Sequence, residues 1–391
     1  MRIASASVPA AQPRRSYGLL STFPPTACGL ATFTAALADG LVETGGSAGV
    51  VRVADGRRSA DPRVVGELDN GVPASIDAAA ERLNGHDVVI VQHEYGLYGG
   101  PDGDEVVGLL RKLTVPSIVV AHTVLLEAKD HQRTVLEEVA DLAGRLVVMT
   151  EAARTRLLDL FDVDPAKVTT IPHGAAVPPP RRTEHGHRLA PPARPMLLTW
   201  GLLGPGKGIE WAVDALADLR DLRPRPQYVI AGRTHPKVLA AEGDTYRDML
   251  VERTWTRGVA NSVTFDSSYR TVRALTHMIQ DAAVVVLPYD SRDQVTSGVL
   301  VDALAAGRPV VATAFPHAVE VLSGGAGIVV PHGDAAAMST ALRRLLTDRE
   351  LARSMAAAAA RIAPTLRWST VAGQYADLAE QLLARRGAVV A

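Results

Sequence analysis

Short apolar runs that alternate with longer helix-like segments, twice along the chain, are the feature that most constrains the fold. Such runs, bounded by helices, are typical of strands buried on both faces of a parallel sheet. The order indicates an α/β domain with helices on both faces of the sheet. In the first half, the expected strands are 87–92, 117–121, 146–149 and 168–171, and the expected helices are 104–113, 132–143 and 151–160.

A proline-rich, basic segment interrupts this alternation. Residues 178–195 contain six prolines together with several arginines and histidines. Because proline breaks helices and lacks the amide that a sheet needs, the segment is predicted to be a domain boundary. We expect an N-terminal Rossmann-like domain at 1–185, a C-terminal one at 186–365 and a final helix at 366–391.

The same alternation then restarts, which predicts a second α/β half. Its expected strands are 196–200, 227–231, 263–265, 283–287 and 310–312, and its expected helices are 209–219, 245–257, 271–280 and 298–306. Ligands of doubly wound sheets bind outside the carboxyl ends of the strands, so two facing halves are expected to hold a ligand in the cleft between them. The final helix carries an apolar stripe from Trp368 to Leu382, spaced by three and four, which is expected to pack on a neighbouring surface.

Composition excludes several classes of protein. The formal net charge is −1, so nothing global favours a nucleic acid or an anionic membrane. No apolar stretch is long enough to span a bilayer, and no apolar run between Arg2 and Arg15 suggests a signal peptide. Cys28 is the sole cysteine, which fits a reducing compartment, so a cytoplasmic protein is expected.

Three loops of the first half carry polar groups at expected strand ends. In residues 22–34 a strand meets a glycine, Gly29, just before a helix, where backbone amides attract polar groups. His93 and Glu94 directly follow a buried strand, and so does His122. An imidazole at such a position binds a substrate hydroxyl or hydrogen-bonds its own loop, and both interpretations stay open.

Two loops of the second half are suited to phosphate. Residues 201–208 read GLLGPGKG, in which Gly201 and Gly206 allow a close approach to the backbone and Lys207 supplies a positive charge. A glycine follows this lysine, so the spacing does not match an ATP-binding P-loop. A solvent-exposed Lys207 is the alternative.

The second of these loops runs from a strand into a helix at residues 289–302. Thr296 or Ser297 is expected to cap the helix, and Gly298 leaves the amides of its first turn open to an anion. Asp302, one turn further, suits the two hydroxyls of a ribose. No sequence motif for a metal site is present.

Together with residues 201–208 and His122, the segment 297–313 (SGVLVDALAAGRPVVAT) resembles the retaining GT-B glycosyltransferases of family 4. The resemblance covers nearly the whole chain, and it implies two Rossmann-like domains with a last helix that crosses back to the first. It also implies that Lys207 contacts the donor diphosphate and that His122 lies near the transferred sugar. Gly29 matches the glycine of the family's acceptor-side loop. His93 and Glu94 are also expected to lie on the acceptor side.

The chain departs from the family at two places. The family usually has two glutamates eight positions apart, where this chain has Gln294 and Asp302. Asp302 still suits the ribose, whereas Gln294 brings no negative charge to the sugar. Gln294 is therefore expected to act on the sugar through hydrogen bonds. The expected catalytic residues are His122, Lys207 and Gln294. An arginine that often follows the glycine of the first strand is Leu202 here, and Arg233 is the candidate replacement.

The expected reaction is transfer of a hexose, with retention and without a metal or other cofactor, from a UDP- or GDP-linked sugar to an acceptor hydroxyl. The acceptor is a glycan, a lipid or a small molecule, and the base is expected to bind near residues 265–269. A glycoside phosphorylase of the same fold and a catalytically silent sugar-nucleotide-binding protein stay open as alternatives. A peripheral membrane contact through the linker around Arg181 also stays open, and the oligomeric state is not predicted.

Overall fold

A seven-stranded sheet organises the first half of the chain within the residues that the computed structural model describes, which are 14–178, 194–268 and 270–390. The strand order is β3-β2-β1-β4-β5-β6-β7, and β1 pairs in parallel with β2 and β4. The strands are β1 (Ser16–Ser21), β2 (Ser47–Val53), β3 (Val64–Leu68), β4 (Val88–His93), β5 (Ser117–Ala121), β6 (Arg145–Val148) and β7 (Val168–Thr170). The helices are α1 (Gly29–Glu43), α2 (Pro73–Asn84), α3 (Glu105–Leu110), α4 (Asp130–Leu142) and α5 (Glu151–Leu160), with short 3-10 turns at Pro101–Gly103 and Pro165–Lys167.

The second half forms a sheet of six parallel strands in the described residues, in the order β10-β9-β8-β11-β12-β13. The strands are β8 (Met196–Trp200), β9 (Gln227–Ala231), β10 (Val263–Asp266), β11 (Val284–Leu287), β12 (Val310–Thr313) and β13 (Gly327–Val330). The helices are α6 (Ile209–Ala217), α7 (Pro236–Glu242), α8 (Thr245–Thr256), α9 (Val272–Asp281), α10 (Gly298–Ala305), α11 (Pro316–Leu322), α12 (Ala335–Thr347) and α13 (Arg349–Ile362), with 3-10 turns at Ala260–Ser262 and Ala363–Leu366.

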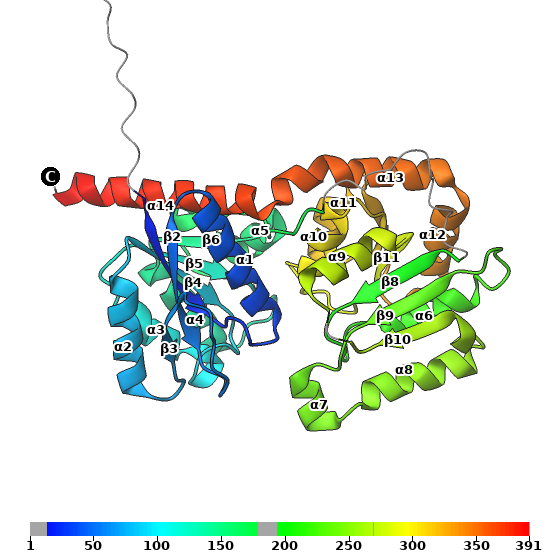
Figure 1. The fold of residues 1–391 in the computed structure, drawn as a ribbon, viewed down its shortest axis with the longest axis horizontal. Helices are drawn as coiled ribbons and strands as arrows, with labels where there is room; N and C mark the ends of the chain where they lie inside the picture. Colours follow the sequence, from blue (N-terminus) through cyan, green and yellow to red (C-terminus); the bar gives the residue numbers. More distant parts are fainter. Residues whose placement is uncertain (1–13, 179–193, 269, 391) are drawn as a thin grey trace, which may run out of the picture. The chain divides into compact units, whose positions relative to one another are not determined.

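Helices cover both faces of this second sheet, as Figure 1 shows. One apolar cluster joins the sheet to α9, α10, α11 and α13. Another joins its opposite face to α6, α8 and α12. The strands are therefore buried on both sides, which explains their continuous apolar sequences.

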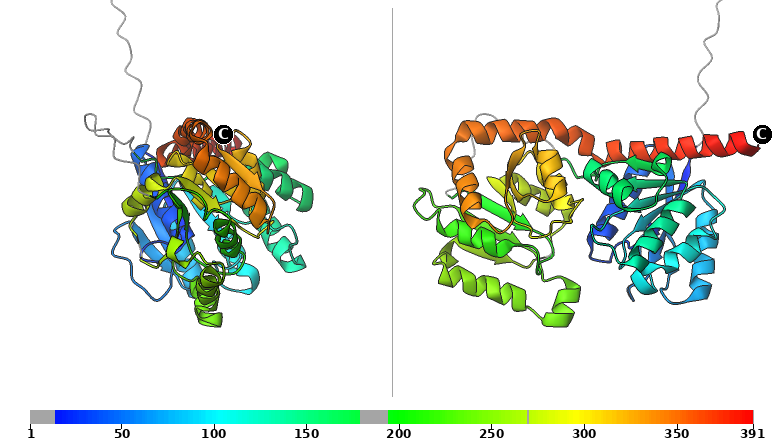
Figure 2. Two further views of the ribbon diagram at one scale, coloured as in Figure 1. Left: turned by 90° about the vertical axis from the view of Figure 1, so that its right-hand side faces the viewer. Right: turned by 180° about the vertical axis from the view of Figure 1, so that it is seen from behind.

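The last helix, α14 (Trp368–Val390), continues from the second half into contact with the first. Its predicted stripe is buried from Val371 to Leu382, whereas Trp368 is partly buried, and Arg15 forms an ion pair with Glu380. Figure 2 shows this helix in red. Among the residues that the structure describes, no helix has the length and apolar character that a membrane span requires.

Contacts divide the chain into two compact units. The first unit runs to Val120 and also contains Thr134–Leu146 and the residues from Ala372 onward, whereas the second contains Ala121–Arg133 and Val147–Val371. The segments after β5 and β6, including His122 and α5, therefore belong to the second unit. The predicted boundary at residue 185 and the linker residue Arg181 lie outside the described residues.

Two doubly wound parallel sheets were predicted, and this part of the prediction is confirmed. Several expected elements have the predicted bounds, among them β5, β8, β9 and α5. The elements β2, β3, α2, α7, α11, β13 and α12 were not predicted.

Candidate functional site

The loop between β8 and α6 approaches the loop after β11 closely. Gly208 has a φ of 60°, and a Cβ atom at this position would lie 1.8 Å from the carbonyl oxygen of Pro288. Glycine is therefore required on both conformational and steric grounds. The carbonyl of Gly206 accepts a hydrogen bond of 3.0 Å from the amide of Asp290, which fixes the two loops together.

Lys207 lies at the centre of this contact. Its Nζ atom is 4.6 Å from the centre of the Tyr289 ring, a cation–π distance. Burial lowers the pKa of the Lys207 ammonium, and no carboxylate in the described part of the chain pairs with it. The prediction of a positive charge at this edge of the sheet thus corresponds to a largely buried ammonium rather than to a solvent-exposed one.

Tyr289 connects Lys207 with the start of α10. Burial raises the pKa of Tyr289 to about 12, against which a hydrogen bond with Ser297 acts. Of the two predicted capping residues, Ser297 caps α10, because its Oγ accepts from the amide of Leu300 at 3.3 Å. The ammonium and the residue that caps the helix, which were predicted separately, therefore both contact Tyr289.

The loop that precedes α10 is held by hydrogen bonds of its own. The Nε2 of Gln294 donates to the carbonyl of Thr296 at 3.1 Å. The hydroxyl of Thr296 is buried and has no hydrogen-bond partner in the described residues. This bond uses one amide hydrogen of Gln294 and leaves the acceptor sites of its Oε1 unengaged.

Two histidines lie at the N-terminus of α10, the buried His317 and the partly buried His173, and neither was predicted. The Nδ1 of His317 accepts from the amide of Ser297 at 2.8 Å, so this ring is neutral, and burial lowers its pKa to about 3. A Cβ atom at Gly298 would lie 3.0 Å from the Nε2 of His173. Burial lowers the pKa of His173 to about 4, and its ring packs on Trp368 at 5.7 Å. A side chain at Gly298 would therefore be in tight contact with the ring of His173.

Asp302 follows one turn into α10. Its side chain is partly buried, and burial raises its pKa to about 7. No donor to this carboxylate is found among the described residues. A carboxylate that retains all its acceptor sites suits hydroxyl groups, as the ribose assignment requires.

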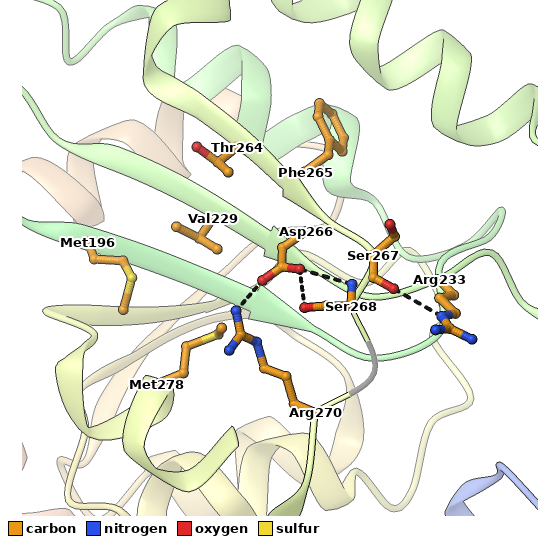
Figure 3. A pocket seen from close by; sticks show the side chains of 10 residues that line it. All are labelled: Met196, Val229, Arg233, Thr264, Phe265, Asp266, Ser267, Ser268, Arg270 and Met278. Atoms are coloured by element: carbon orange, nitrogen blue, oxygen red, sulfur yellow. Dashed lines mark hydrogen bonds and ion pairs between the residues drawn. The ribbon is translucent and has the colours of Figure 1, made fainter. Parts of the chain in front are cut away.

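Arg233 lies at the end of β9, in a different setting. Its Nε donates to the carbonyl of Ser267 at 2.9 Å. It lines an open pocket of about 700 Å³ along the edge strand β10 and helix α9, shown in Figure 3. The lining residues are Met196, Val229, Arg233, Thr264, Phe265, Asp266, Ser267, Ser268, Arg270 and Met278. This lining includes the residues where base binding was predicted, except Tyr269, which lies outside the described residues, and it does not include Lys207.

The predicted acceptor-side residues have the following places in the first unit. Gly29 is the first residue of α1, and a Cβ atom there would meet no atom within 4 Å, so the space beside it is open. His93 ends β4 with only 1% of its surface exposed, and burial lowers its pKa to about 4. Glu94 accepts from the amide of Tyr95 at 3.1 Å. His122, by contrast, follows β5 within the second unit and is partly buried.

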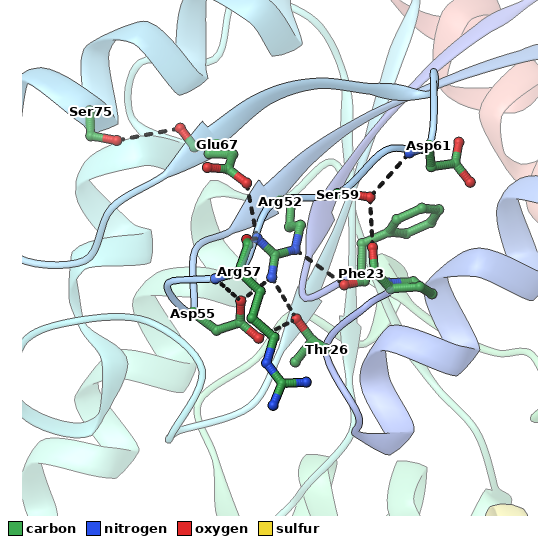
Figure 4. A network of polar contacts seen from close by, with 10 residues as sticks. Phe23, Thr26, Arg52, Asp55, Arg57, Ser59, Asp61, Glu67 and Ser75 are labelled. Atoms are coloured by element: carbon green, nitrogen blue, oxygen red, sulfur yellow. Dashed lines mark hydrogen bonds and ion pairs between the residues drawn. The ribbon is translucent and has the colours of Figure 1, made fainter. Parts of the chain in front are cut away.

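A buried arginine supports the loop before Gly29 and was not predicted. Arg52 of β2 is fully buried and pairs with Asp55 and Glu67. It also donates to the hydroxyl of Thr26 at 2.9 Å and to the carbonyl of Phe23 at 3.2 Å (Figure 4). The charged residue inside an otherwise apolar strand was the available sequence signal.

In the part of the chain that the structure describes, no group of three or more His, Cys, Asp or Glu side chains is arranged to hold a metal ion.

Residues 180–362 match the family model described as Glycosyl transferases group 1. The match covers the loop of Lys207, the loop of Gln294 and helix α10.

Two curated relatives extend the similarity. The chain is 30% identical over 274 residues to a D-inositol 3-phosphate glycosyltransferase of Kineococcus radiotolerans, covering 64% of this chain and 61% of the relative. It is 28% identical over 269 residues to an alpha-D-kanosaminyltransferase of Streptomyces kanamyceticus, covering 64% and 66%. The chain thus spans somewhat less than two thirds of the length of these two relatives.

Solved structures define the fold. HepE of Anabaena, in complex with UDP, superposes with a TM-score of 0.73 at 16% identity over 94% of this chain and 100% of that one. Sucrose-phosphate synthase of Thermosynechococcus elongatus superposes with a TM-score of 0.74 at 20% identity over 95% and 100%. Together with the two parallel sheets, these similarities confirm the predicted GT-B fold.

Proposed function

We propose that the protein is a retaining glycosyltransferase of family 4 that moves a hexose from a nucleoside diphosphate sugar to an acceptor hydroxyl, without a metal or other cofactor. The observation that carries the proposal is the Lys207 ammonium, largely buried without a carboxylate partner and joined through Tyr289 to the N-terminus of α10. An isolated buried cation is costly, so the arrangement favours an anionic ligand. The amides of Gly298 and Val299 are well suited to share that anion.

A diphosphate leaving group fits both parts of this arrangement. As the bond to the sugar breaks, negative charge develops on the diphosphate, and a fixed ammonium and helix dipole stabilise that charge. Asp302 would accept from the two ribose hydroxyls, which requires its ionised form. Of the named relatives and structures, two are glycosyltransferases by name and one holds UDP, so UDP is the first nucleotide to test.

Retention is proposed from the family resemblance, and Gln294 then bears on the route by which retention would be achieved. An amide cannot serve as a carboxylate nucleophile, so attack on the same face as the departing diphosphate is the proposed route. In this proposal His122 orients the acceptor or the sugar, Arg233 adds charge for the donor, and Gly29, His93 and Glu94 bind the acceptor.

The test measures nucleotide binding and turnover separately. Lys207→Met should weaken UDP or GDP binding by about tenfold or more in calorimetry, because a charge-assisted bond is lost. The matched control is Lys237→Met, an exposed lysine of α7 in the same unit, which should bind like the wild type. His122→Ala should retain nucleotide binding and lose most transfer from the corresponding nucleotide sugar.

Other outcomes decide against the proposal. Wild-type turnover in Lys207→Met or His122→Ala would remove the roles given to these residues. Nucleotide binding without transfer to any acceptor would indicate a silent binding protein. Phosphate-dependent release of a sugar phosphate, without nucleotide binding, would indicate a phosphorylase.

A further inference from the structure

Arg156 of α5 hydrogen-bonds the backbone of two separate loops. Its Nη1 atom donates to the carbonyl of Val124 at 2.9 Å and to the carbonyl of Asp293 at 2.8 Å. A guanidinium nitrogen of this kind carries two N–H bonds, so both contacts are made at once. The side chain is 10% exposed, and the carboxylate of Asp293, half exposed, is 3.9 Å away. The charge of Arg156 is therefore directed mainly at main-chain oxygens.

The first turn of the same helix adds a third contact to one of these loops. Thr150 caps α5, since its Oγ1 accepts from the amide of Ala153 at 3.0 Å. The same hydroxyl donates to the carbonyl of Val295 at 2.9 Å. With one bond accepted and its single proton donated, this hydroxyl connects the helix to the loop in a defined direction.

Helix α5 is itself held by α11. The carboxylate of Glu320 accepts from the amides of Glu151 and Ala152, at 3.0 and 2.8 Å. A carboxylate at a helix N-terminus is stabilised by the helix dipole as well as by these bonds. The helix that carries Arg156 is thus anchored at its start and is a rigid base for the two loops.

The two loops are those that contain the proposed catalytic side chains. Val124 is two residues after His122, and Asp293 and Val295 are the immediate neighbours of Gln294. We propose that Arg156 is a positioning residue that fixes the segment after His122 relative to the loop of Gln294. The catalytic part of this inference rests on the proposed function. The structural part does not, because it concerns backbone contacts within the second unit.

Arg156 acts through the two loops and contacts neither proposed catalytic side chain in these bonds. Neutral replacement removes two charge-assisted hydrogen bonds and leaves two carbonyls to find other donors. The expected result is greater motion of both loops at once, with the sheet of the second unit unchanged. General weakening of the fold would instead affect the strands as well.

The test is amide hydrogen exchange on the full chain, for wild type, Arg156→Met and Arg156→Lys. Arg156→Met should speed exchange by about tenfold in residues 122–129 and 289–297 together, and leave β8 and β9 unchanged. Arg156→Lys, which keeps the charge and reaches one carbonyl, should give a smaller effect. The control is Arg154→Met, an arginine on the same helix without a hydrogen bond to either loop, which should exchange like the wild type.

Kinetics give a second readout. With the donor that the wild type uses, Arg156→Met should lower kcat by about tenfold and leave nucleotide affinity and KM within about threefold, with partial rescue in Arg156→Lys. Unchanged exchange in both segments, or equal acceleration in β8 and β9, would overturn the inference. If the wild type neither binds nor uses a nucleotide sugar, the proposed function fails while hydrogen exchange still decides the role of Arg156.

Discussion

Replacement of Asp302 by Asn should stabilise the protein relative to the wild type at neutral pH. In acid the two proteins should have nearly the same stability. Burial raises the pKa of Asp302 from 3.8 to about 7, so between these values the folded chain holds a proton that the unfolded chain has lost. Stability therefore falls as pH rises through this range. One pKa unit corresponds to about 1.4 kcal/mol. The free energy of unfolding of the wild type should therefore fall by up to about 4 kcal/mol between about pH 4 and pH 7.

An asparagine has nearly the same shape and does not ionise. The advantage of Asp302→Asn should therefore be close to zero below about pH 4 and should grow to a plateau above about pH 7. Urea unfolding of both proteins across this range measures the difference directly. A difference that is independent of pH would refute the reasoning, because the carboxyl would then titrate alike in the folded and unfolded chain.

Asp266 offers a control of opposite sign. Hydrogen bonds from Ser268 and Arg270 lower the pKa of this carboxyl to about 2. Its contribution to stability is present above the pKa of the unfolded chain and is lost as pH falls toward about 2. Asp266→Asn should therefore destabilise the protein at neutral pH and have less effect in acid.

The same pKa has a consequence for ligand binding under the proposed function. Ribose hydroxyls bind the ionised form of Asp302, so UDP affinity should rise as pH increases through about 7 and should lose this dependence in Asp302→Asn. Calorimetry at several pH values tests this. An unchanged pH dependence in the variant would separate Asp302 from the nucleotide.

Three further substitutions test the architecture by chemical unfolding. Gly208→Ala should lower the free energy of unfolding by about 2–4 kcal/mol, because the φ of Gly208 is 60° and the new Cβ would lie 1.8 Å from the carbonyl oxygen of Pro288. The control is Gly373→Ala on helix α14, where a Cβ meets no atom within 4 Å, and it should stabilise the protein by about 0.5–1 kcal/mol. Equal effects of the two would contradict the close loop contact. Arg52→Leu should cost about 1–3 kcal/mol, because it removes the donor to the carbonyl of Phe23 and the hydroxyl of Thr26, and no loss of stability would count against the network. His317→Leu should cost about 1–3 kcal/mol through the unpaired amide that caps α10, while His317→Asn, which keeps an acceptor, should cost less.

Much of the fold was predictable because both sheets are buried on two faces. Strands such as β5 and β9 are continuous apolar runs with polar or proline residues at their ends, so their bounds follow from the sequence. Strand β2 was missed because Arg52 interrupts its apolar run. The partners that neutralise this arginine, Asp55 and Glu67, meet it only in the folded sheet.

The candidate site was predictable where a residue type is itself the signal. The residue types of the glycines and Lys207 in residues 201–208, and of the turn from Gln294 to Gly298, predict a phosphate site, and the family resemblance implies the diphosphate contact of Lys207. The sequence also left two choices open that the structure decides, namely which residue caps α10 and whether Lys207 is exposed. Ser297 caps the helix, and Lys207 packs on Tyr289.

The sequence by itself thus determined the two α/β halves, the expected strand ends and the residue types suited to a diphosphate. Only the tertiary structure decided what holds them in place: His317 on the amide of Ser297, and Arg156 on the carbonyls of Val124 and Asp293. The physical reason is that these partners are main-chain groups far away in sequence. Every residue has such groups, so no pattern of side chains reveals which of them a buried histidine or arginine will meet.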